Sequence, residues 1–489
     1  MTGRPGAEAH ALDPRALPLA YDAVLERGAD GRHRVRYRLP IPYFRLFWAP
    51  LVRRRARRVE EAADAGRPLP VDVPWWAPPV PQDARATATV ACLCLIGAVS
   101  SYGGGTGGLL TQTLPYAAKV YDVGNGALGT GLAIVRIGVL VALLLGPLAD
   151  RLGRRRLVVG AIVAHCLMTA VIGLAPTFDV YIAGHVVLRC IDTLLGVAAG
   201  ILAVESVPAG NRAVTLSLVF LASGAGVALA VASLPVAAAG RAGFAAVYLV
   251  QLLALPLVLH AGRRLRESPR FVVHAAERHG YRELLRRPLA RRVALVGGVA
   301  FLTAIFFAPT AEFFTRYLDD VRHFSSLQIV LFLALTGAPA SLTVVLGGRL
   351  ADIRGRKVIA VPAIVIAAVS FAGFFLTGPP WLWLFAFTGQ VLGSLSLAAS
   401  GVYTPELFPT RVRAAANTLG LACAVSGSGA GLATAGALAG PLGVGPAIAV
   451  LAIFPLLGAT LIALRFPETR GRSLEHTSGD TVPAPVEVL

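Results

Sequence analysis

Long apolar stretches, separated by short segments rich in charge, proline or glycine, dominate the chain from about residue 87 onward. Each holds roughly 20 residues or more, enough for a helix to cross the ~30 Å hydrocarbon core of a bilayer. Twelve such spans are predicted, at 87–112, 126–148, 156–175, 179–204, 213–236, 243–261, 292–316, 326–349, 357–377, 380–404, 413–437 and 443–465. An open sheet edge is unstable in lipid because its backbone groups stay unpaired, and these runs are too long for the strands of a barrel. We therefore expect an all-α polytopic membrane protein.

The polar motifs between these spans occur twice, about 200 residues apart. Three motifs in one order at one offset indicate an internal duplication. The repeated residues are Gly146, Asp150, Arg154, Glu205, Arg212, Glu267 and Arg270 in the first copy and Gly348, Asp352, Arg356, Glu406, Arg413, Glu468 and Arg470 in the second. Duplicated halves around a central site are the plan of many secondary transporters.

The duplication divides the chain into five parts. We expect an Arg- and Pro-rich N-terminal extension at 1–86, six-helix bundles at 87–261 and 292–466, a basic linker at 262–291 and a tail at 467–489. Within the extension, residues 42–58 mix aromatic side chains with a basic run, which suits a short helix on an anionic leaflet. The alternative is a solvated, mostly disordered tail.

Charge is distributed unevenly along the chain. Hydrophobic residues make up 55% of it, yet the formal net charge is +18. Most of the 45 Lys and Arg residues fall in the extension and in alternate loops that would share one face. This positive-inside pattern predicts a multi-pass protein of the cytoplasmic membrane with both termini in the cytoplasm. The positive charge is therefore explained by the orientation of the chain in the membrane, and nucleic acid is not expected as a partner.

The first repeated motif falls in a short cytoplasmic turn of each half. Gly146 and Gly348 remove side-chain bulk where two helices must pack closely. Asp150 and Asp352 can accept hydrogen bonds from a neighbouring helix N-terminus or from arginine. The cluster could form a gate that breaks in another conformation, or it could be a static topology anchor.

The second motif closes the fourth and tenth spans. Prolines end these helices, so Glu205 and Glu406 face the same membrane rim as Arg212 and Arg413. Ion pairs between the acids of one half and the bases of the other would hold the cytoplasmic side shut. Because exposed pairs contribute little, this role requires a network that is partly removed from water.

These residues resemble the major facilitator superfamily, whose hallmark is the loop G-x-L-a-D-x-x-G-R-[RK]. Three further runs resemble its sugar-porter and organic-ion branches: Glu267–Phe271, Tyr403–Arg411 and Pro467–Glu475. The resemblance covers roughly residues 87–476. It implies two pseudo-symmetric bundles that rock around a midplane cavity, with the motif residues as the inner gate. Gly105 stands where proton-coupled sugar porters often carry Asp.

Charged residues within the predicted spans are candidates for the transport chemistry. Arg189 and Asp192 lie three residues apart near the middle of span four, on one helix face, where they can neutralise each other. They resemble the superfamily's R-x-x-[QD]-G motif, which is tied to proton coupling in antiporters. The alternative is a self-satisfied structural pair. The equivalent of Arg189 in the second half is Gln390.

Other polar residues in or near the spans are candidates for binding substrate or protons. His165 and His185 are expected to be hydrogen-bonded core residues. Glu312 is expected to form a surface pair with Arg316. The remaining candidates are Arg136, Gln112, Gln390 and Asn417.

Together these features predict a secondary active transporter that moves a small organic solute (a sugar, an organic acid or an organic ion) by alternating access. We expect protons as the coupling ion and a functional monomer surrounded by membrane lipids. Two alternatives are a proton-antiport exporter of drugs or natural products and a non-transporting membrane sensor. The chain carries no G-x-S-x-G, H-E-x-x-H or P-loop motif, so no catalytic residue, metal or cofactor is expected.

Overall fold

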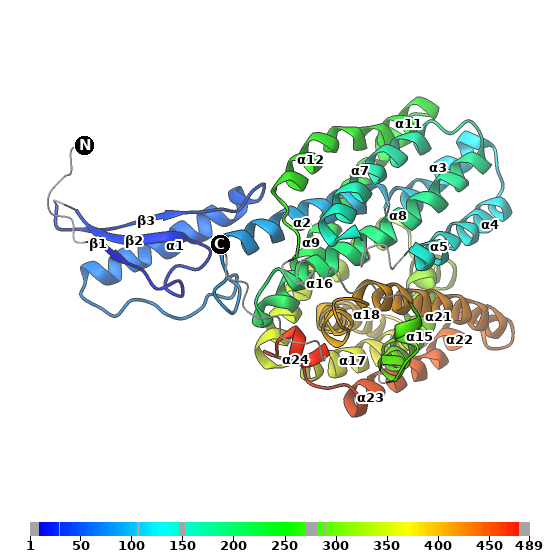
Figure 1. Cartoon of the computed structure of the whole chain (residues 1–489). Coiled ribbons are helices and arrows are strands. Elements are labelled where there is room, and N and C mark those ends of the chain that lie inside the picture. The colour runs from blue at the N-terminus through cyan, green and yellow to red at the C-terminus, as the bar shows by residue number, and fades with distance from the viewer. Residues whose placement is uncertain are drawn as a thin grey trace.

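The protein consists of two helical bundles and a small unit of strands and one helix attached beside the first bundle (Figure 1). The computed structural model describes residues 9–28, 30–104, 108–145, 152–268, 281–287 and 289–478. Among these, eleven helices are long and apolar enough to cross a membrane. A shorter apolar helix, Thr130–Leu145, adjoins residues outside the described ranges. The all-α fold of twelve crossings predicted from the sequence is confirmed.

The first bundle is built from the first half of the duplication. Its helices are α2 (Ala84–Gly103), α3 (Leu109–Tyr121), α4 (Asn125–Val135), α5 (Ile137–Leu145), α7 (Arg154–Gly173), α8 (Phe178–Glu205), α9 (Arg212–Ala232), α10 (Leu234–Ala237), α11 (Arg241–Leu249) and α12 (Leu255–Arg264). The helix predicted at 87–112 instead ends at Gly103, and α3 continues to Tyr121. Glycine is costly inside a helix, which explains the break at the glycine-rich segment that follows.

The second bundle repeats the arrangement. Its helices are α15 (Leu289–Arg316), α16 (Ser326–Arg354), α17 (Arg356–Leu376), α18 (Trp381–Gly393), α19 (Leu395–Gly401), α20 (Tyr403–Leu407), α21 (Arg413–Leu442), α22 (Val444–Ala449) and α23 (Ile453–Arg465). Two short helices, α14 (Tyr281–Leu284) and α24 (Leu474–Ser478), flank this bundle in sequence.

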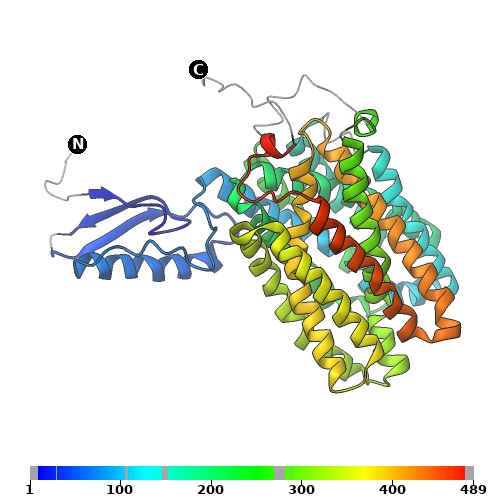
Figure 2. The same ribbon diagram turned by 90° about the horizontal axis from the view of Figure 1, so that it is seen from below.

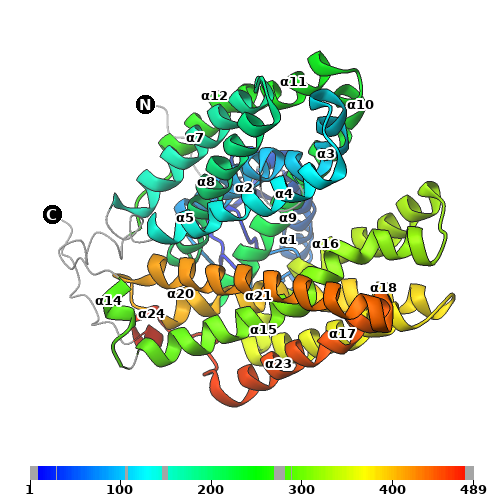
Figure 3. The same cartoon turned by 90° about the vertical axis from the view of Figure 1, so that its right-hand side faces the viewer.

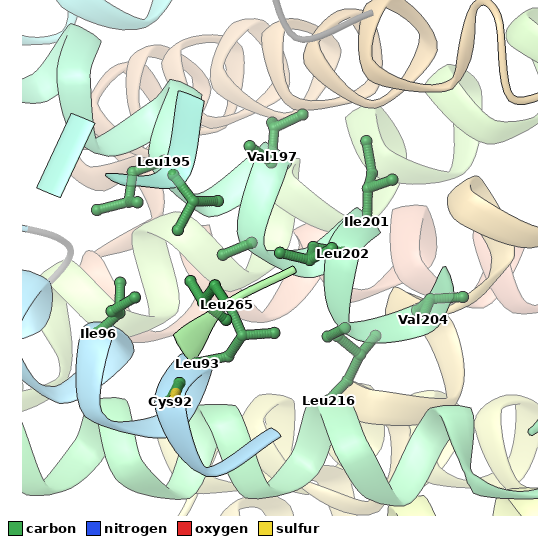
Figure 4. Close-up of a cluster of buried hydrophobic side chains, with 14 of the residues drawn as sticks. Cys92, Leu93, Ile96, Leu195, Val197, Ile201, Leu202, Val204, Leu216 and Leu265 are labelled. Atoms are coloured by element: carbon green, nitrogen blue, oxygen red, sulfur yellow. The ribbon is translucent and has the colours of Figure 1, made fainter. Parts of the chain in front are cut away.

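The two bundles meet along a seam, visible between the upper and lower halves of Figure 3. At the seam α9 packs against α16 and α19, while α5 and α8 pack against α21. A buried apolar cluster crosses it, because Leu202 and Leu216 of the first bundle join Ala351, Val402 and Ala414 of the second. Figure 4 shows part of this cluster, with labelled residues from α2, α8 and α9 and Leu265, which follows α12. Apolar burial therefore joins the bundles where the duplicated motifs also lie.

The N-terminal unit comprises β1 (Ala9–Ala11), β2 (Tyr21–Arg27), β3 (His33–Arg38) and α1 (Arg45–Asp64). The strands form an antiparallel sheet in the order β1-β2-β3. Val52 and Ala56 of α1 pack with Leu17 and Ala20, and Val35 of β3 packs against them. Figure 2 shows this unit projecting sideways from the bundles.

This folded unit rules out one of the two alternatives, a mostly disordered tail, over the described residues from 9 onward. The helix expected within 42–58 is present as α1, and a sheet that the sequence analysis did not foresee covers one side of it. The signal for the sheet lies in His33–Arg38, where arginine alternates with His33, Val35 and Tyr37 and only the latter set is partly buried. Such period-two alternation is typical of a half-buried strand.

The segment 65–83 connects the N-terminal unit to both bundles. Asn211, at the start of α9, donates to the carbonyl oxygen of Val80 at 2.7 Å and accepts from its N–H at 2.9 Å. From the second bundle, Arg349 of α16 donates to the carbonyl oxygens of Val73 (3.3 Å) and Ala77. The connection therefore spans the seam.

We expect Val52→Asp to unfold the N-terminal unit while the bundles stay assembled. Val52 is fully buried, and a buried carboxylate without a partner costs several kcal/mol, more than so small a core can supply. Limited proteolysis of the purified full chain should cut within residues 9–64 much faster than in the wild type. Arg53→Asp, which places the same charge at an exposed neighbour, is the control. Equal cleavage of the two variants would contradict the packing of α1 on the sheet.

Candidate functional site

The repeated motifs gather at one end of the two bundles, which we call the motif end. It is defined by the residues Arg154, Glu205, Arg212, Arg356, Glu406 and Arg413. Both glutamates stand at the last turns of helices, and all four arginines begin helices. Residues about 200 positions apart are thereby brought into contact.

Glu205, the last residue of α8, binds one arginine from each bundle. Its Oε1 accepts a hydrogen bond from Arg413, which begins α21 in the second bundle. Its Oε2 lies 3.7 Å from Nε of Arg154, which begins α7 in its own bundle. Arg154 also reaches across the seam and donates to the carbonyl oxygen of Thr410 at 2.6 Å.

Glu406 in α20 repeats this arrangement with the bundles exchanged. Its Oε1 accepts from Arg212 of the first bundle at 3.2 Å and from Arg356 of its own bundle at 3.2 Å. Thr469 donates to the second carboxylate oxygen at 2.5 Å. The ion pairs expected between acids of one half and bases of the other are therefore present in both copies.

Burial makes these pairs energetically significant. The four arginines are at most 1% exposed and the two glutamates at most 3%. An exposed ion pair contributes about 0–1 kcal/mol, whereas removing one partner of a buried pair costs about 3–5 kcal/mol. Separating the bundles at this end must break the Glu205–Arg413 and Glu406–Arg212 contacts.

The glutamates of the third repeated motif cap the N-termini of α7 and α17, the helices that follow the first repeated motif in each half. Glu267 accepts from the backbone N–H of Arg154 at 3.0 Å, and Glu468 accepts from that of Arg356 at 2.9 Å. Partial burial would raise the pKa of Glu468, but backbone hydrogen bonds from Arg356, Lys357 and Arg470 outweigh it and lower the pKa. A carboxylate at a helix N-terminus satisfies free N–H groups and interacts favourably with the helix dipole.

Glycine is required at the turns before these helices. Gly153 and Gly355 have φ of +98° and +120°, a region that other residues rarely adopt. A Cβ on Gly355 would also lie 2.8 Å from a carboxylate oxygen of Glu468. The tight turns expected from the sequence therefore position both arginines and their caps.

Asp352 joins the second bundle to the N-terminus of α9 in the first. Its carboxylate accepts from the N–H groups of Ala213 (3.2 Å) and Val214 (2.8 Å) and lies 2.9 Å from a guanidinium nitrogen of Arg356. Close approach depends on Gly348, where a Cβ would lie 2.5 Å from the carbonyl oxygen of Ala213. The close helix packing at Gly348 and the capping by Asp352 both match the roles expected for this motif.

The remaining motif residues are placed differently or lie outside the described ranges. Arg470 is exposed, and its backbone N–H donates to Glu468 at 3.0 Å. The predicted gate residues Gly146, Asp150 and Arg270 lie outside the residues that the structure describes.

Between the bundles lies a cavity of about 550 Å³, here called the central cavity. Helices α2, α8 and α9 line it from the first bundle, and α15, α19, α20 and α21 from the second. Its polar lining residues are Ser100, Ser101, Arg189, Asp192, Thr193, Ser223, Thr404 and Asn417. The sequence does not distinguish these hydroxyl residues from others, because Ser and Thr in apolar helices commonly bond their own backbone, as Ser100 does with Gly97.

Asp192 pairs with a residue from a neighbouring helix. Its Oδ1 lies 3.0 Å from Nε2 of His165 in α7, whereas among the described residues no ion pair joins it to Arg189. The expectation that Arg189 and Asp192 neutralise each other is therefore wrong. Gln251 Nε2 lies 3.4 Å from the other ring nitrogen of His165 and donates to the carbonyl oxygen of Val99 at 2.9 Å.

Two glycines at the end of α2 allow this pair to form. A Cβ on Gly104 would lie 1.7 Å from a carboxylate oxygen of Asp192, and one on Gly103 would lie 2.8 Å from the ring of His165. The neighbouring position, Gly105, is where the resemblance suggested an acid, and it lies outside the described residues. Asp192 thus brings a carboxylate from α8 to the end of α2.

The other candidate residues differ in their relation to the cavity. Asn417 lines it, whereas Arg136, Gln112 and Glu312 are not among its described lining residues. Gln390 donates to Thr336 at 2.9 Å within the second bundle. His185 is buried as expected, but among the described residues its Nε2 has no hydrogen-bond partner. Glu312 is exposed on α15, and the side chain of Arg316, its expected partner, is not described.

We expect Glu406→Gln to destabilise the protein by about 3–5 kcal/mol, because Arg212 then loses this buried carboxylate and Arg356 keeps only Asp352. Thermal unfolding of the purified protein in detergent should begin at a clearly lower temperature. Glu205→Gln should behave alike, while Glu312→Gln, which changes an exposed glutamate, should match the wild type. Unchanged unfolding in both motif-end variants would show that the buried pairs contribute no stability.

Known structures share this architecture. The proton:xylose symporter XylE bound to 6-bromo-6-deoxy-D-glucose superposes with a TM-score of 0.67 at 16% identity, covering 81% of this chain and 98% of that chain. The human organic anion transporter MFSD10 (TETRAN) gives a TM-score of 0.62 at 16% identity, covering 77% and 99%. At such identity the likeness shows the fold alone.

Sequence comparison identifies the family. No curated protein matches the chain in sequence. The sequence profile of the Major Facilitator Superfamily matches residues 93–394 and 317–488, which together cover well over half of the chain. The two bundles, the duplicated motifs and the cavity between the bundles agree with this match. The chain belongs to the Major Facilitator Superfamily and is a membrane transporter that works by alternating access, not an enzyme.

Proposed function

We propose that the chain carries a small organic anion, coupled to protons, with the central cavity as its substrate site. Arg189 is the observation that carries the substrate class. It lines the cavity, and no carboxylate among the described residues forms an ion pair with it. A cation within the bilayer is costly unless a partner neutralises it, so an anionic ligand is favoured. A sugar or an organic cation would leave Arg189 without a counter-charge.

The rest of the cavity wall suits an organic body. Hydroxyl groups of Ser100, Ser101 and Thr404 and the amide of Asn417 can bond polar substituents. Between them the lining is apolar, as in many small-molecule sites where a few polar groups fix the orientation of the ligand. Both bundles contribute, so a bound solute would contact both sides of the seam.

Asp192 and His165 are the proposed proton site. The Asp192 side chain is 9% exposed and lines the cavity, while His165 behind it is fully buried. Nε2 of His165 lies 3.0 Å from Oδ1 of Asp192, and its other ring nitrogen lies 3.4 Å from the amide nitrogen of Gln251. A proton from the cavity would be held on this pair, and its arrival would change the charge beside Arg189. Substrate binding and proton binding would then influence each other electrostatically.

The motif end is the proposed cytoplasmic gate. The arginines and lysines of the alternate loops support a cytoplasmic location for it, by the positive-inside rule. In the present conformation the crossed pairs of Glu205 and Glu406 join the bundles there. Alternating access would break both pairs and let the bundles rock apart around the cavity.

Two other functions have some support. A proton-antiport exporter would use the same cavity and the same pair, with protons and solute moving in opposite directions. A membrane sensor gains support from the folded N-terminal unit, because a sensor needs a part through which it signals.

We expect proteoliposomes that hold the purified protein to show a pH change when an organic anion is added, read with an internal pH dye. The panel would include aromatic and aliphatic acids, sugars, organic cations and hydrophobic drugs. Asp192→Asn should abolish the pH change, because an amide cannot take up the proton. Thr193→Val alters the neighbouring lining residue and is the control.

The sign of the pH change distinguishes import from export. A response to sugars or cations alone would overturn the anion proposal. If the Asp192→Asn protein still takes up tracer and still shows the pH change, the proposed proton site is overturned. Absence of both signals in the wild type would favour the sensor.

We expect a cross-link across the seam to stop transport if the motif end is a moving gate. A Cβ at Gly401 would lie 3.7 Å from Leu216, so Leu216→Cys with Gly401→Cys can be joined by a short thiol-specific cross-linker without touching the ion pairs. Uptake should fall to background after cross-linking with a reducible reagent and return on reduction. Each single variant, treated identically, is the control. Uptake that continues in the cross-linked protein would support a static anchor.

A further inference from the structure

A second cavity lies at the outside of the seam, separate from the central cavity. This side pocket has a volume of about 680 Å³ and is bounded by the N-terminal unit, its connecting segment, α2, α9, α16 and α19. Phe220 of α9 lines both cavities, so this helix forms the wall between them. Both bundles and the N-terminal unit therefore border one space that the transport mechanism does not use.

The side pocket is covered by aromatic side chains. Phe47, Trp48, Trp75 and Trp76 line it, and these include three of the five tryptophans in the chain. Phe47 is 71% exposed and Trp75 is 78% exposed. Most other lining side chains are apolar, with Gln82, Thr87 and Ser341 among the few polar ones. So much exposed apolar surface around an apolar pocket indicates a binding site and disfavours water as its content.

The position of the pocket indicates what can enter it. Ala225 of α9, Ser341 of α16 and Leu397 of α19 line it and are exposed. All three belong to helices that cross the membrane, at positions outside the central cavity. Exposed atoms of a spanning helix at the outer surface of a bundle face lipid, so the occupant comes from the bilayer. Tryptophan is enriched at the membrane–water interface, which agrees with an entrance at that level.

Charge next to the pocket indicates the head group. Arg54 follows Phe47 by seven residues on α1, which is two turns along the same helix face. Arg53 and Arg54 are exposed. A lipid whose tail reached Phe47 would place its head group near these guanidinium groups, which bind phosphate readily.

We propose that the side pocket binds an acyl chain of an anionic phospholipid whose head group lies against Arg53 and Arg54. The tail fills the space between α9 and α16 beneath the tryptophans. The bound lipid thereby holds the N-terminal unit against both bundles at the membrane surface.

The test uses the full chain in detergent micelles that contain small mole fractions of phosphatidylglycerol with brominated acyl chains, since bromine quenches nearby tryptophan fluorescence. Trp381→Phe and Trp383→Phe leave Trp48, Trp75 and Trp76 as the reporters. We expect quenching that saturates as lipid is added. Ala225→Phe, which fills the pocket, should abolish the saturating part. Ala232→Phe adds the same ring two turns further along α9, outside the pocket lining, and should leave it intact.

Brominated phosphatidylcholine with the same chains tests the head group. It should bind about fivefold more weakly for each arginine that contacts the anionic lipid, and Arg53→Gln with Arg54→Gln should remove the difference. Quenching that rises only in proportion to lipid content, or that is lost equally in Ala225→Phe and Ala232→Phe, would overturn the acyl-chain site. Equal affinity for both lipids in the wild type would overturn the anionic head group.

Discussion

Two buried glutamates, each shared between an arginine of its own bundle and an arginine of the other, hold the motif end together. Buried charges persist only when they are paired and hydrogen-bonded, and this requirement accounts for much of the surrounding sequence. Gly355 turns the chain so that α17 can begin at Arg356, and Glu468 caps that first turn. Gly348 lets α16 approach α9 closely enough for Asp352 to cap it.

The duplication is strict at the motif end and relaxed in the central cavity. The crossed ion pairs require the same residues in both bundles, because the glutamate of each bundle pairs with an arginine of the other. The cavity has no such requirement. Arg189 lines it from the first bundle, whereas the equivalent Gln390 bonds Thr336 within the second. In the proposed mechanism the symmetric part opens and closes, and the asymmetric part recognises the solute and the proton.

The N-terminal unit brings the membrane surface into this arrangement. Its connecting segment bonds Asn211 of the first bundle and Arg349 of the second, so movement at the seam must change these contacts. The side pocket lies in the same region and is bordered by both bundles. The sequence signal for this unit is weak, because charged residues alternate with partly buried ones only in β3 and a small core needs few apolar residues.

The amino-acid sequence is enough to establish the membrane crossings, the duplication and the types of residue at the motif end. Length and hydropathy decide whether a segment spans a bilayer, and a motif that occurs twice shows its own symmetry. Even the crossed pairing of Glu205 and Glu406 with arginines of the opposite half could be inferred from matching charges at one rim. The contact between Asp192 and His165, and the position of Arg189 at the cavity without an ion-pair partner among the described residues, depend on how the helices pack. Spacing along one helix shows which residues share a face, but the packing of α7, α8 and the end of α2 selects the partner.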